Sequence, residues 1–487
     1  MLCRSLYTVL LLCWGFSLYG LQVNVNNTTN RVVYVKFAGN NLVVDNTDEV
    51  IQPNSNQPFN LTSVSSGRIY LSYDVPLSSN APDGANPSDP DYAKRFDKIE
   101  LTYANGAGMA NLTAVDFYAI PFLLQTEIQN LIVNQFTLDP KTTGTELTQA
   151  ILGLSSKTTK SAIKNSNEIV RVLSPVKAPT GYKSLQSYIT STLGSSLEIK
   201  GNYFSSNGYI PYDYTGSISA DAITLAMSGN QTLTIPTKEL VNIAGDVNSN
   251  AIYTCNGVYY LSGSGTAPHY VSENDFYAAV YRDVISGYNF GYIGGKYGNN
   301  SLNWWGNLPY ASANTNYNLY ADVVNRLYPG AYGFPFSDRQ KNLLADLGGM
   351  VDALTITVLQ DNAVPPVQPI PGVLNPQTGS VVFNAVLISE NDIQDAPFTF
   401  GGNQMKAGWI NNYHGGPQTN LKNGKAAQIQ SVNAQDGYNR YELVFGRNKY
   451  TVIVRVVIGK ITIATIAGGG NANWALPNLF IGGLQTN

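Results

Sequence analysis

Hydrophobic and polar residues alternate in the first part of the chain, as they do in strands with one buried face. Residues 31–37 are rich in β-branched and aromatic side chains, and residues 67–73 alternate regularly. Two more strands are predicted over 98–103 and 111–118, and the short segment 104–108 between them contains glycine. We therefore expect a hairpin-like pair of strands in this region.

The hydrophobic spacing changes after residue 121. Apolar residues there recur three and four positions apart, which is typical of helices. Strand patterns return over 196–260 and again over 351–360. The predicted helices cover 122–135, 145–154, 183–193, 274–286 and 317–328.

Strands, a helical middle and strands again favour an α+β, mainly β fold on an antiparallel sandwich or barrel. A Pro-rich linker over 363–372 separates the main body, residues 21–362, from a β-rich C-terminal module over 373–487. Within the body, we expect a barrel part over about 21–120 and 196–265 with 350–360, and a helical part over about 121–195 and 270–345.

Residues 1–20 have the layout of a secretory signal peptide. Arg4 is a single early cation, the run from Leu6 to Leu18 is largely apolar, and Gly20 is small enough to precede a cleavage site. The run is shorter than the roughly 20 apolar residues of a membrane span. We expect a mature chain that starts near Leu21 and is secreted, extracellular or periplasmic; an uncleaved anchor is the alternative.

Charged residues are scarce, at 13% of the chain against about 25% in typical domains. The net charge is −3, and no basic stripe is present that could neutralise a phosphate backbone, so no nucleic-acid partner is expected. No later segment looks long and apolar enough for a membrane span, so no membrane partner is expected after signal cleavage. The abundant Asn, Ser, Thr, Gly and Tyr suit an uncharged, hydroxyl-rich ligand.

Histidine, cysteine and phosphate chemistry have little support in the sequence. The 2 histidines, His269 and His414, lie far apart, which leaves too few ligands for catalytic zinc and no evident Ser-His-Asp arrangement. Cys255 is the only cysteine after the signal segment and is expected to be buried or incidental. No GxxxxGK[ST] loop occurs. We therefore expect no metal and no cofactor.

Carboxylate chemistry remains, and it needs an acid and a base held on a rigid surface with room for a sugar. Asp97, Glu100 and Asp116 lie on or beside the two strands of the predicted hairpin. Whether Glu100 and Asp116 share a face depends on the register of the pair, which this pattern leaves open. Solvated acids on an exposed strand are the alternative interpretation.

Two sequence blocks in this hairpin, Phe96–Tyr103 and Ala110–Phe117 with the following Ile120-Pro121, resemble the signature of glycoside hydrolase family 64. Further matching blocks follow in order at 171–175, 277–281 and 332–338, so that the resemblance covers about 30–360. The resemblance implies an inverting β-1,3-glucanase with Glu100 as general acid and Asp116 as general base. It also implies a thaumatin-like antiparallel β-sandwich or barrel with a helical α/β subdomain.

From their positions in the sequence, we expect Thr102, Thr113 and Asp338 to contact the substrate. A structural hydrogen bond is the alternative for each. The adjacent Trp304 and Trp305 are candidate platforms for a pyranose ring, and core packing is the alternative there. The chain departs from relatives at two positions: Ser337 stands where they tend to carry an acid, and Met109 where they often carry a tryptophan.

These observations predict a secreted, endo-type β-1,3-glucanase that acts with inversion, is monomeric and has β-1,3-glucan as its partner. The first alternative is a thaumatin-like protein that binds β-glucan without cutting it. Retention of both Glu100 and Asp116 argues against that alternative, because binding alone needs neither. The second alternative is a wall-active protein that acts on another glycan.

Overall fold

We describe a computed structural model of the 487-residue chain. The structure describes residues 20–366, with gaps at 129–130, 155–160, 206–207, 228–230, 241–249, 263–266, 272–274, 305–309, 311–316, 340–342 and 349–350; beyond residue 366 it describes strands only. The predicted signal segment, residues 1–20, lies outside the described residues except for Gly20. No described helix is long and apolar enough to cross a membrane.

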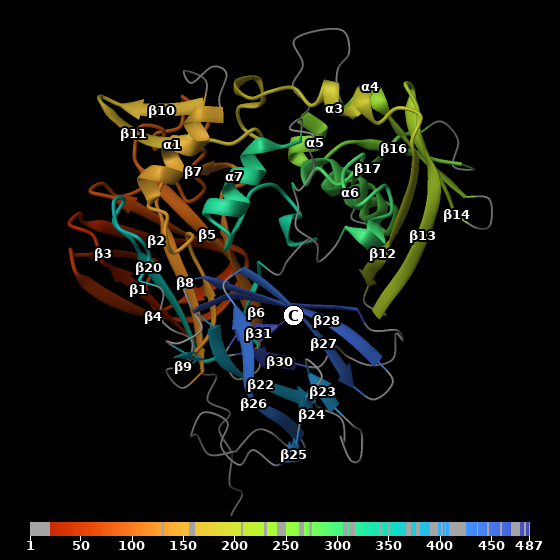
Figure 1. The fold of residues 1–487 in the computed structure, drawn as a ribbon. Coiled ribbons are helices and arrows are strands. Elements are labelled where there is room, and N and C mark those ends of the chain that lie inside the picture. The colour runs from red at the N-terminus through yellow and green to blue at the C-terminus, as the bar shows by residue number, and fades with distance from the viewer. Residues whose placement is uncertain are drawn as a thin grey trace, which may run out of the picture.

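The largest sheet has eleven strands and curls into a nearly closed, barrel-like shape (Figure 1). Its order is β18-β6-β5-β4-β1-β20-β8-β9, with β2, β3 and β19 paired to this path. The predicted strand over 351–360 is confirmed as β20, which lies parallel to β1. The strands are β1 (Leu21–Asn27), β2 (Val33–Val44), β3 (Asp48–Ile51), β4 (Ser55–Tyr73), β5 (Phe96–Ala104), β6 (Ala107–Thr113), β8 (Phe122–Ile128), β9 (Leu131–Phe136), β18 (Ala331–Tyr332), β19 (Ala345–Asp346) and β20 (Ala353–Val358).

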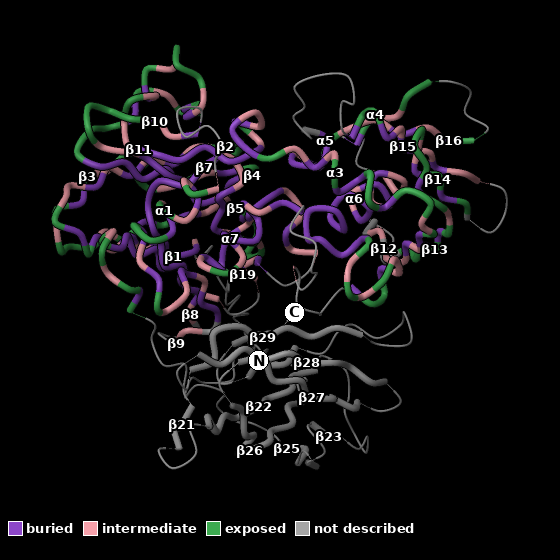
Figure 2. Tube along the Cα trace, turned by 45° about the horizontal axis from the view of Figure 1, so that its top comes forward, coloured by how far each residue is buried: buried purple, intermediate pink, exposed green. Residues whose placement is uncertain are grey.

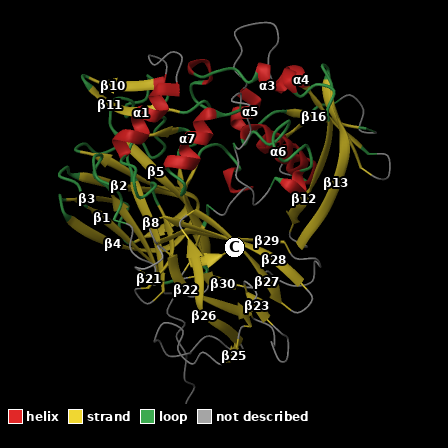
Figure 3. Ribbon diagram, viewed as in Figure 1, coloured by secondary structure: helices red, strands yellow, loops and turns green. Residues whose placement is uncertain are grey.

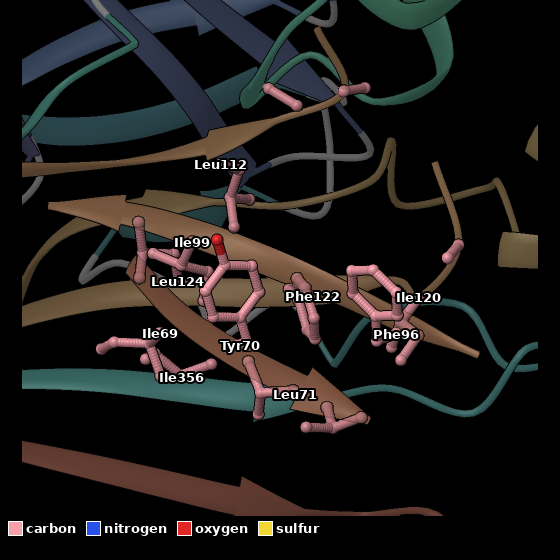
Figure 4. Close-up of a cluster of buried hydrophobic side chains, with 14 of the residues drawn as sticks. Ile69, Tyr70, Leu71, Phe96, Ile99, Leu112, Ile120, Phe122, Leu124 and Ile356 are labelled. Carbon is pink, nitrogen blue, oxygen red and sulfur yellow. The ribbon is translucent and has the colours of Figure 1, made fainter. Parts of the chain in front are cut away.

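Aliphatic side chains from the inner face of this sheet form the first core. Leu21, Val23 and Val25 alternate with more exposed residues along β1, as expected for a strand with one buried face. Figure 4 shows part of this core, where Ile69 and Leu71 of β4 lie near Ile99 of β5. The sheet is therefore anchored by a packed interior.

A second, six-stranded antiparallel sheet has its own core. The structure places β12 to β17 in this separate sheet, packed against α6 (Phe276–Asn289). The expectation that 196–265 belongs to the barrel is therefore wrong. Alternation predicts that a segment is a strand, but the choice of sheet depends on its neighbours in space. The strands are β12 (Ser196–Ser205), β13 (Gly208–Ile218), β14 (Ala222–Met227), β15 (Thr232–Pro236), β16 (Val258–Leu261) and β17 (His269–Tyr270).

Four of the five predicted helices are confirmed, with shifted ends. The fifth, over 122–135, is wrong, because this segment forms β8 and β9. Residues 122–126 of β8 are all buried, so the strand shows no alternation that would distinguish it from a helix. The helices are α1 (Gly144–Leu154), α3 (Gln186–Ser191), α4 (Thr237–Leu240), α5 (Asn250–Thr254), α6 and α7 (Leu319–Leu327), with short 3-10 turns η1 (Pro179–Gly181), η3 (Ser301–Asn303) and η4 (Ser337–Arg339).

The helices gather on one side of the molecule, between the barrel and the second sheet (Figure 3). A small sheet lies beside them and consists of β7 (Phe117–Tyr118), β11 (Glu168–Leu173) and β10 (Ala162–Asn165). Buried positions run through the strands of the barrel, while its turns and edges are exposed (Figure 2). The strand β7 matters for the site because it directly follows Asp116.

Beyond residue 366, the described strands form two further sheets. One has the order β25-β26-β22-β30-β31 with β21 paired to β22, and the other has the order β24-β23-β27-β28-β29. The strands are β21 (Gly372–Asn375), β22 (Ser380–Ser389), β23 (Phe398–Phe400), β24 (Asn403–Gln404), β25 (Lys406–Gly408), β26 (Lys425–Gln435), β27 (Gly437–Phe445), β28 (Asn448–Val457), β29 (Lys460–Gly468), β30 (Asn478–Ile481) and β31 (Leu484–Thr486).

Candidate active site

A two-residue turn sets the register of the hairpin that carries the candidate acid. Asn105 and Gly106 both have positive φ, 54° and 76°, as a type I′ turn requires. The turn pairs Ala104 with Ala107, and every later pair follows from that. Directly opposite residues lie on the same face of a sheet.

The register places Glu100 between two polar partners. Glu100 of β5 is opposite Asn111 of β6 on one side and Arg68 of β4 on the other. The Asn111 Nδ2 donates to Glu100 Oε2 at 3.3 Å, and the Arg68 guanidinium lies 3.6 Å from Glu100 Oε1. The side chain of Glu100 keeps 35% of its exposure. A carboxyl held in this way is oriented yet still reachable by a ligand.

Exposure rises steadily along this face of β5. Phe96 is fully buried and Lys98 is 8% exposed, whereas Glu100 is partly exposed and Thr102 is exposed. The buried end is covered by Arg171, whose guanidinium lies 4.1 Å from the centre of the Phe96 ring. Glu100 therefore lies where the covered part of the sheet meets its open part.

Asp116 does not lie on a strand, contrary to the prediction over 111–118. The strand β6 ends at Thr113, and Asp116 lies in the short connection to β7. The backbone there is fixed on both sides, because Ala114 N–H donates to Tyr332 O at 2.8 Å and Ser174 N–H donates to Asp116 O at 3.0 Å. The connection crosses from the barrel to the small sheet and carries Asp116 with it.

Two lysines surround the Asp116 carboxylate. The Lys98 ammonium donates to Asp116 Oδ2, and Lys177 Nζ lies 3.7 Å from Oδ1. Burial by itself raises the pKa of Asp116, but the charge and hydrogen bond of Lys98, together with the charges of Lys177 and Arg68, outweigh it and hold the pKa below its usual value. Asp116 is therefore ionised at neutral pH.

Lys98 is the common neighbour of the two candidate carboxyls. It lies two residues before Glu100 on the same face of β5. Burial lowers the pKa of Lys98, but the negative charges of Asp116 and Glu100 raise it overall. The structure thus brings Glu100 and Asp116 to one side of the sheet, around a buried cation that sequence reasoning missed.

Asp97 lies on the opposite face and has a different environment. Its carboxylate accepts N–H bonds from Lys98 at 2.8 Å, Ala119 at 2.7 Å and Ile120 at 3.1 Å. Burial raises the pKa of Asp97 to about 7 despite these three bonds. Asp97 ties the start of β5 to the segment that follows Asp116, so it has a positioning role and is not exposed to a ligand.

Of the two candidate threonines, only Thr102 lies on the open surface. Thr102 is exposed, and its hydroxyl accepts the N–H of Ser66 at 3.3 Å. Thr113 is 5% exposed, and its hydroxyl accepts the N–H of Val115 at 3.3 Å. The geometry favours a structural hydrogen bond for Thr113 and leaves Thr102 as the better candidate contact. Met109, opposite Thr102, is 47% exposed.

Asp338 approaches the site from η4. The Tyr332 side chain hydrogen-bonds Asp338, and Tyr332 pairs with Thr113 at the edge of β6. Burial raises the pKa of the Asp338 carboxyl. Ser337, the departure from the family pattern, caps its own turn: its hydroxyl donates to Phe334 O at 2.6 Å and accepts the N–H of Gly333 at 3.1 Å.

The predicted stacking platform at Trp304 is wrong. Trp304 is 0% exposed, and its ring stacks on Tyr292 with centroids 5.8 Å apart. Its indole N–H donates to Gly298 O at 2.7 Å. Trp304 therefore anchors a loop in the second core, and Trp305 lies outside the described residues.

Metal ligands do not gather in the part of the chain that the structure describes: no three His, Cys, Asp or Glu side chains there are grouped closely enough to hold an ion. Cys255 is buried, and burial raises the pKa of its thiol well above the usual value. The arrangement at Glu100 and Asp116 is the candidate for acid–base chemistry, because both carboxyls are partly exposed and lie beside Lys98.

Comparison with known proteins identifies the family of most of the chain. The sequence model of the β-1,3-glucanases of glycoside hydrolase family 64 matches residues 24–360, which is more than half of the chain. No curated protein matches the chain.

Solved structures show a related fold. The chain is similar to a laminaripentaose-producing β-1,3-glucanase in complex with laminaritetraose, with 15% sequence identity, a TM-score of 0.51, and coverage of 70% of this chain and 98% of that chain. A β-1,3-glucanase domain from Clostridium beijerinckii matches at 15% identity, with a TM-score of 0.44 and coverage of 70% and 98%. The first likeness shows the fold alone.

Proposed function

The chain belongs to glycoside hydrolase family 64, the β-1,3-glucanases, and we propose that it is a secreted endo-type enzyme that hydrolyses β-1,3-glucan with inversion. In this proposal Glu100 is the general acid and Asp116 is the general base. The observation that carries it is the placement of both carboxyls around Lys98, where the covered part of the β5 face meets its open part.

The two carboxyls differ in how strongly cations surround them. Asp116 is hydrogen-bonded by Lys98 and has Lys177 at 3.7 Å, whereas Glu100 is paired with Arg68 at 3.6 Å and interacts with Lys98 only through its charge. Nearby cations favour the ionised form of a carboxyl. Asp116 is therefore better suited to remain a carboxylate and act as base, which leaves Glu100 to carry the proton.

The reaction then proceeds in one displacement. Glu100 donates its proton to the glycosidic oxygen while Asp116 removes a proton from a water molecule, and the oxygen of that water attacks the anomeric carbon from the opposite side. The bond to the leaving sugar breaks as the bond to water forms, so the configuration at that carbon inverts. Proton exchange with solvent returns both carboxyls to their starting states.

Other parts of the proposal rest on position and sequence. The open face beside Glu100 presents the Thr102 hydroxyl, and Asp338 is linked to the neighbouring strand through Tyr332. We assign both as contacts for sugar hydroxyls. The apolar run within residues 1–20 supports secretion, and the scarcity of charge supports a neutral polysaccharide substrate.

Replacement of the acid tests the proposal directly. Glu100→Gln should lower the rate of reducing-end release from laminarin by roughly 10²–10⁴-fold while the circular dichroism spectrum stays unchanged. Glu239→Gln, at an exposed position of α4, is the matched control and should keep wild-type activity. NMR of the first products should show the α-anomer. Wild-type protein that binds laminarin without releasing reducing ends would instead identify a glucan-binding protein.

A further inference from the structure

A pocket of about 470 Å³ opens on the same face of the sheet and is lined by Arg68, the residue of β4 that is paired with Glu100. Its wall includes Arg68 and Tyr70 of β4, the part of β2 around Asn40, Asp48 at the start of β3, and the loop at Asn80 and Ala81. We name it the Arg68 pocket and propose that it is a subsite for glucosyl units of the glucan chain beyond the cleavage point. This inference rests on the proposed function.

The sheet register makes the pocket continuous with the candidate acid. Arg68 pairs with Glu100 on one side and with Ala38 of β2 on the other. Its guanidinium is 3.6 Å from Glu100 while its side chain also lines the pocket. A chain that lies across the strands at Glu100 therefore meets the Arg68 pocket next.

The lining of the pocket suits a neutral, hydroxyl-rich ligand. Asn40, Asp48, Arg68 and Asn80 offer both donors and acceptors. The volume falls within the roughly 300–1,000 Å³ of small-molecule pockets. Asp48 and Arg68 in the wall carry opposite charges that balance each other, so the lining favours an uncharged sugar over an anion.

The loop that closes the pocket is held in place by the fold. The Asp91 carboxylate accepts the N–H groups of Ser78 and Ser79, each at 2.8 Å, and Asp91 is 0% exposed. The buried Arg171 donates to the carbonyl of Gly84 at 2.9 Å. These anchors lie on either side of Asn80 and Ala81, so this wall is formed before a ligand arrives.

Filling the pocket tests the inference. In Ala81→Trp the indole should occupy the Arg68 pocket and remove several sugar hydrogen bonds, which lowers kcat/KM for laminarin by about tenfold. The loss should grow with chain length across an oligosaccharide series from laminaritriose to laminariheptaose. Asn80→Ala removes one polar group and should cause a smaller loss, about threefold to tenfold. Ala220→Trp, at an exposed bend before β14, is the matched control and should change nothing.

The outcomes separate the pocket from the chemistry. A loss in Ala81→Trp that is equal for all chain lengths, or absent, overturns the subsite. Laminarihexaose binding, measured by calorimetry in a Glu100→Gln background, gives a reading that needs no turnover. Weaker binding by Ala81→Trp than by Ala220→Trp supports the pocket even if the wild type proves inactive, whereas equal binding overturns it.

Discussion

The barrel and the second sheet build their cores from different side chains. The barrel core is mainly aliphatic, as at Ile99 and Leu112. The second core is rich in aromatic residues, and there Tyr188 packs edge-on against Tyr288 with centroids 5.3 Å apart. Its tyrosines also need hydrogen-bond partners: Tyr188 donates to Ile293 O at 2.6 Å. Some of the buried tyrosine hydroxyls of the second core are thus held by directional bonds.

The two regions also use charge differently. Around the site, the side chains of Glu100 and Asp116 keep 35% and 27% of their exposure, so a ligand can reach them. In the second region, Asp283 is 1% exposed and forms a bidentate pair with Arg339 at 2.6 and 2.7 Å, while Tyr212 donates to it at 2.6 Å. Under the proposed function, the charges of the barrel face serve chemistry, whereas the buried pair of the second region serves stability.

The largest expected effect on stability comes from breaking the buried pair. Arg339→Met leaves the Asp283 carboxylate buried without its cation, which should lower the free energy of unfolding by about 3–5 kcal/mol. Urea denaturation followed by circular dichroism measures this loss. Arg326→Met is the matched control, because Arg326 is 59% exposed and pairs with Asp322 within α7. The control should lower the free energy of unfolding by no more than about 1 kcal/mol. Equal losses in both variants would contradict the distinction between the buried pair and the exposed pair.

A second prediction concerns the pH dependence of the barrel site. Lys98 holds the pKa of Asp116 down, so Lys98→Met should raise it. The acidic limb of the kcat/KM profile, which reports the base of the free enzyme, should then move to higher pH. Activity should fall most under acidic conditions and recover as the pH rises.

The neighbouring lysine supplies the control for that pH profile. Lys177 lies 3.7 Å from Asp116 and makes the smaller contribution to its pKa. Lys177→Met should therefore move the acidic limb less than Lys98→Met. A loss that is the same at every pH in Lys98→Met would mean that Lys98 only positions Asp116.

The hairpin shows how far local sequence predicts the site. The strand pattern located β5 but placed the second strand too late, since β6 begins at Ala107 and ends at Thr113. The Asn105-Gly106 pair carries the register, because a two-residue turn there fixes Glu100 opposite Asn111. The same period of two, counted back from Glu100, identifies Lys98 as a residue of the site. Both signals are therefore contained in the local sequence.

Other features depend on contacts that local sequence does not contain. The buried run of β8 lacks alternation because both faces of the strand are covered. Trp304 lies between glycine-rich segments that favoured exposure, yet Tyr292 and the Gly298 carbonyl bury it. Asp116 leaves the strand because Ala114 donates to Tyr332 in the barrel sheet, while Asp116 itself accepts from Ser174, which directly follows β11 of the small sheet. Such outcomes follow from tertiary packing.

The smallest effect is expected at the open end of the barrel face. Thr102→Val keeps the shape of the side chain and removes the hydroxyl, which should raise KM for laminarin by about twofold to tenfold with little change in kcat, since one sugar hydrogen bond is lost. Thr113→Val is the matched variant on the paired strand. Because Thr113 is buried and bonds Val115, its replacement should lower stability and leave KM unchanged. A higher KM in Thr113→Val alone would instead indicate that the substrate contacts Thr113, on the side of the site that faces β18.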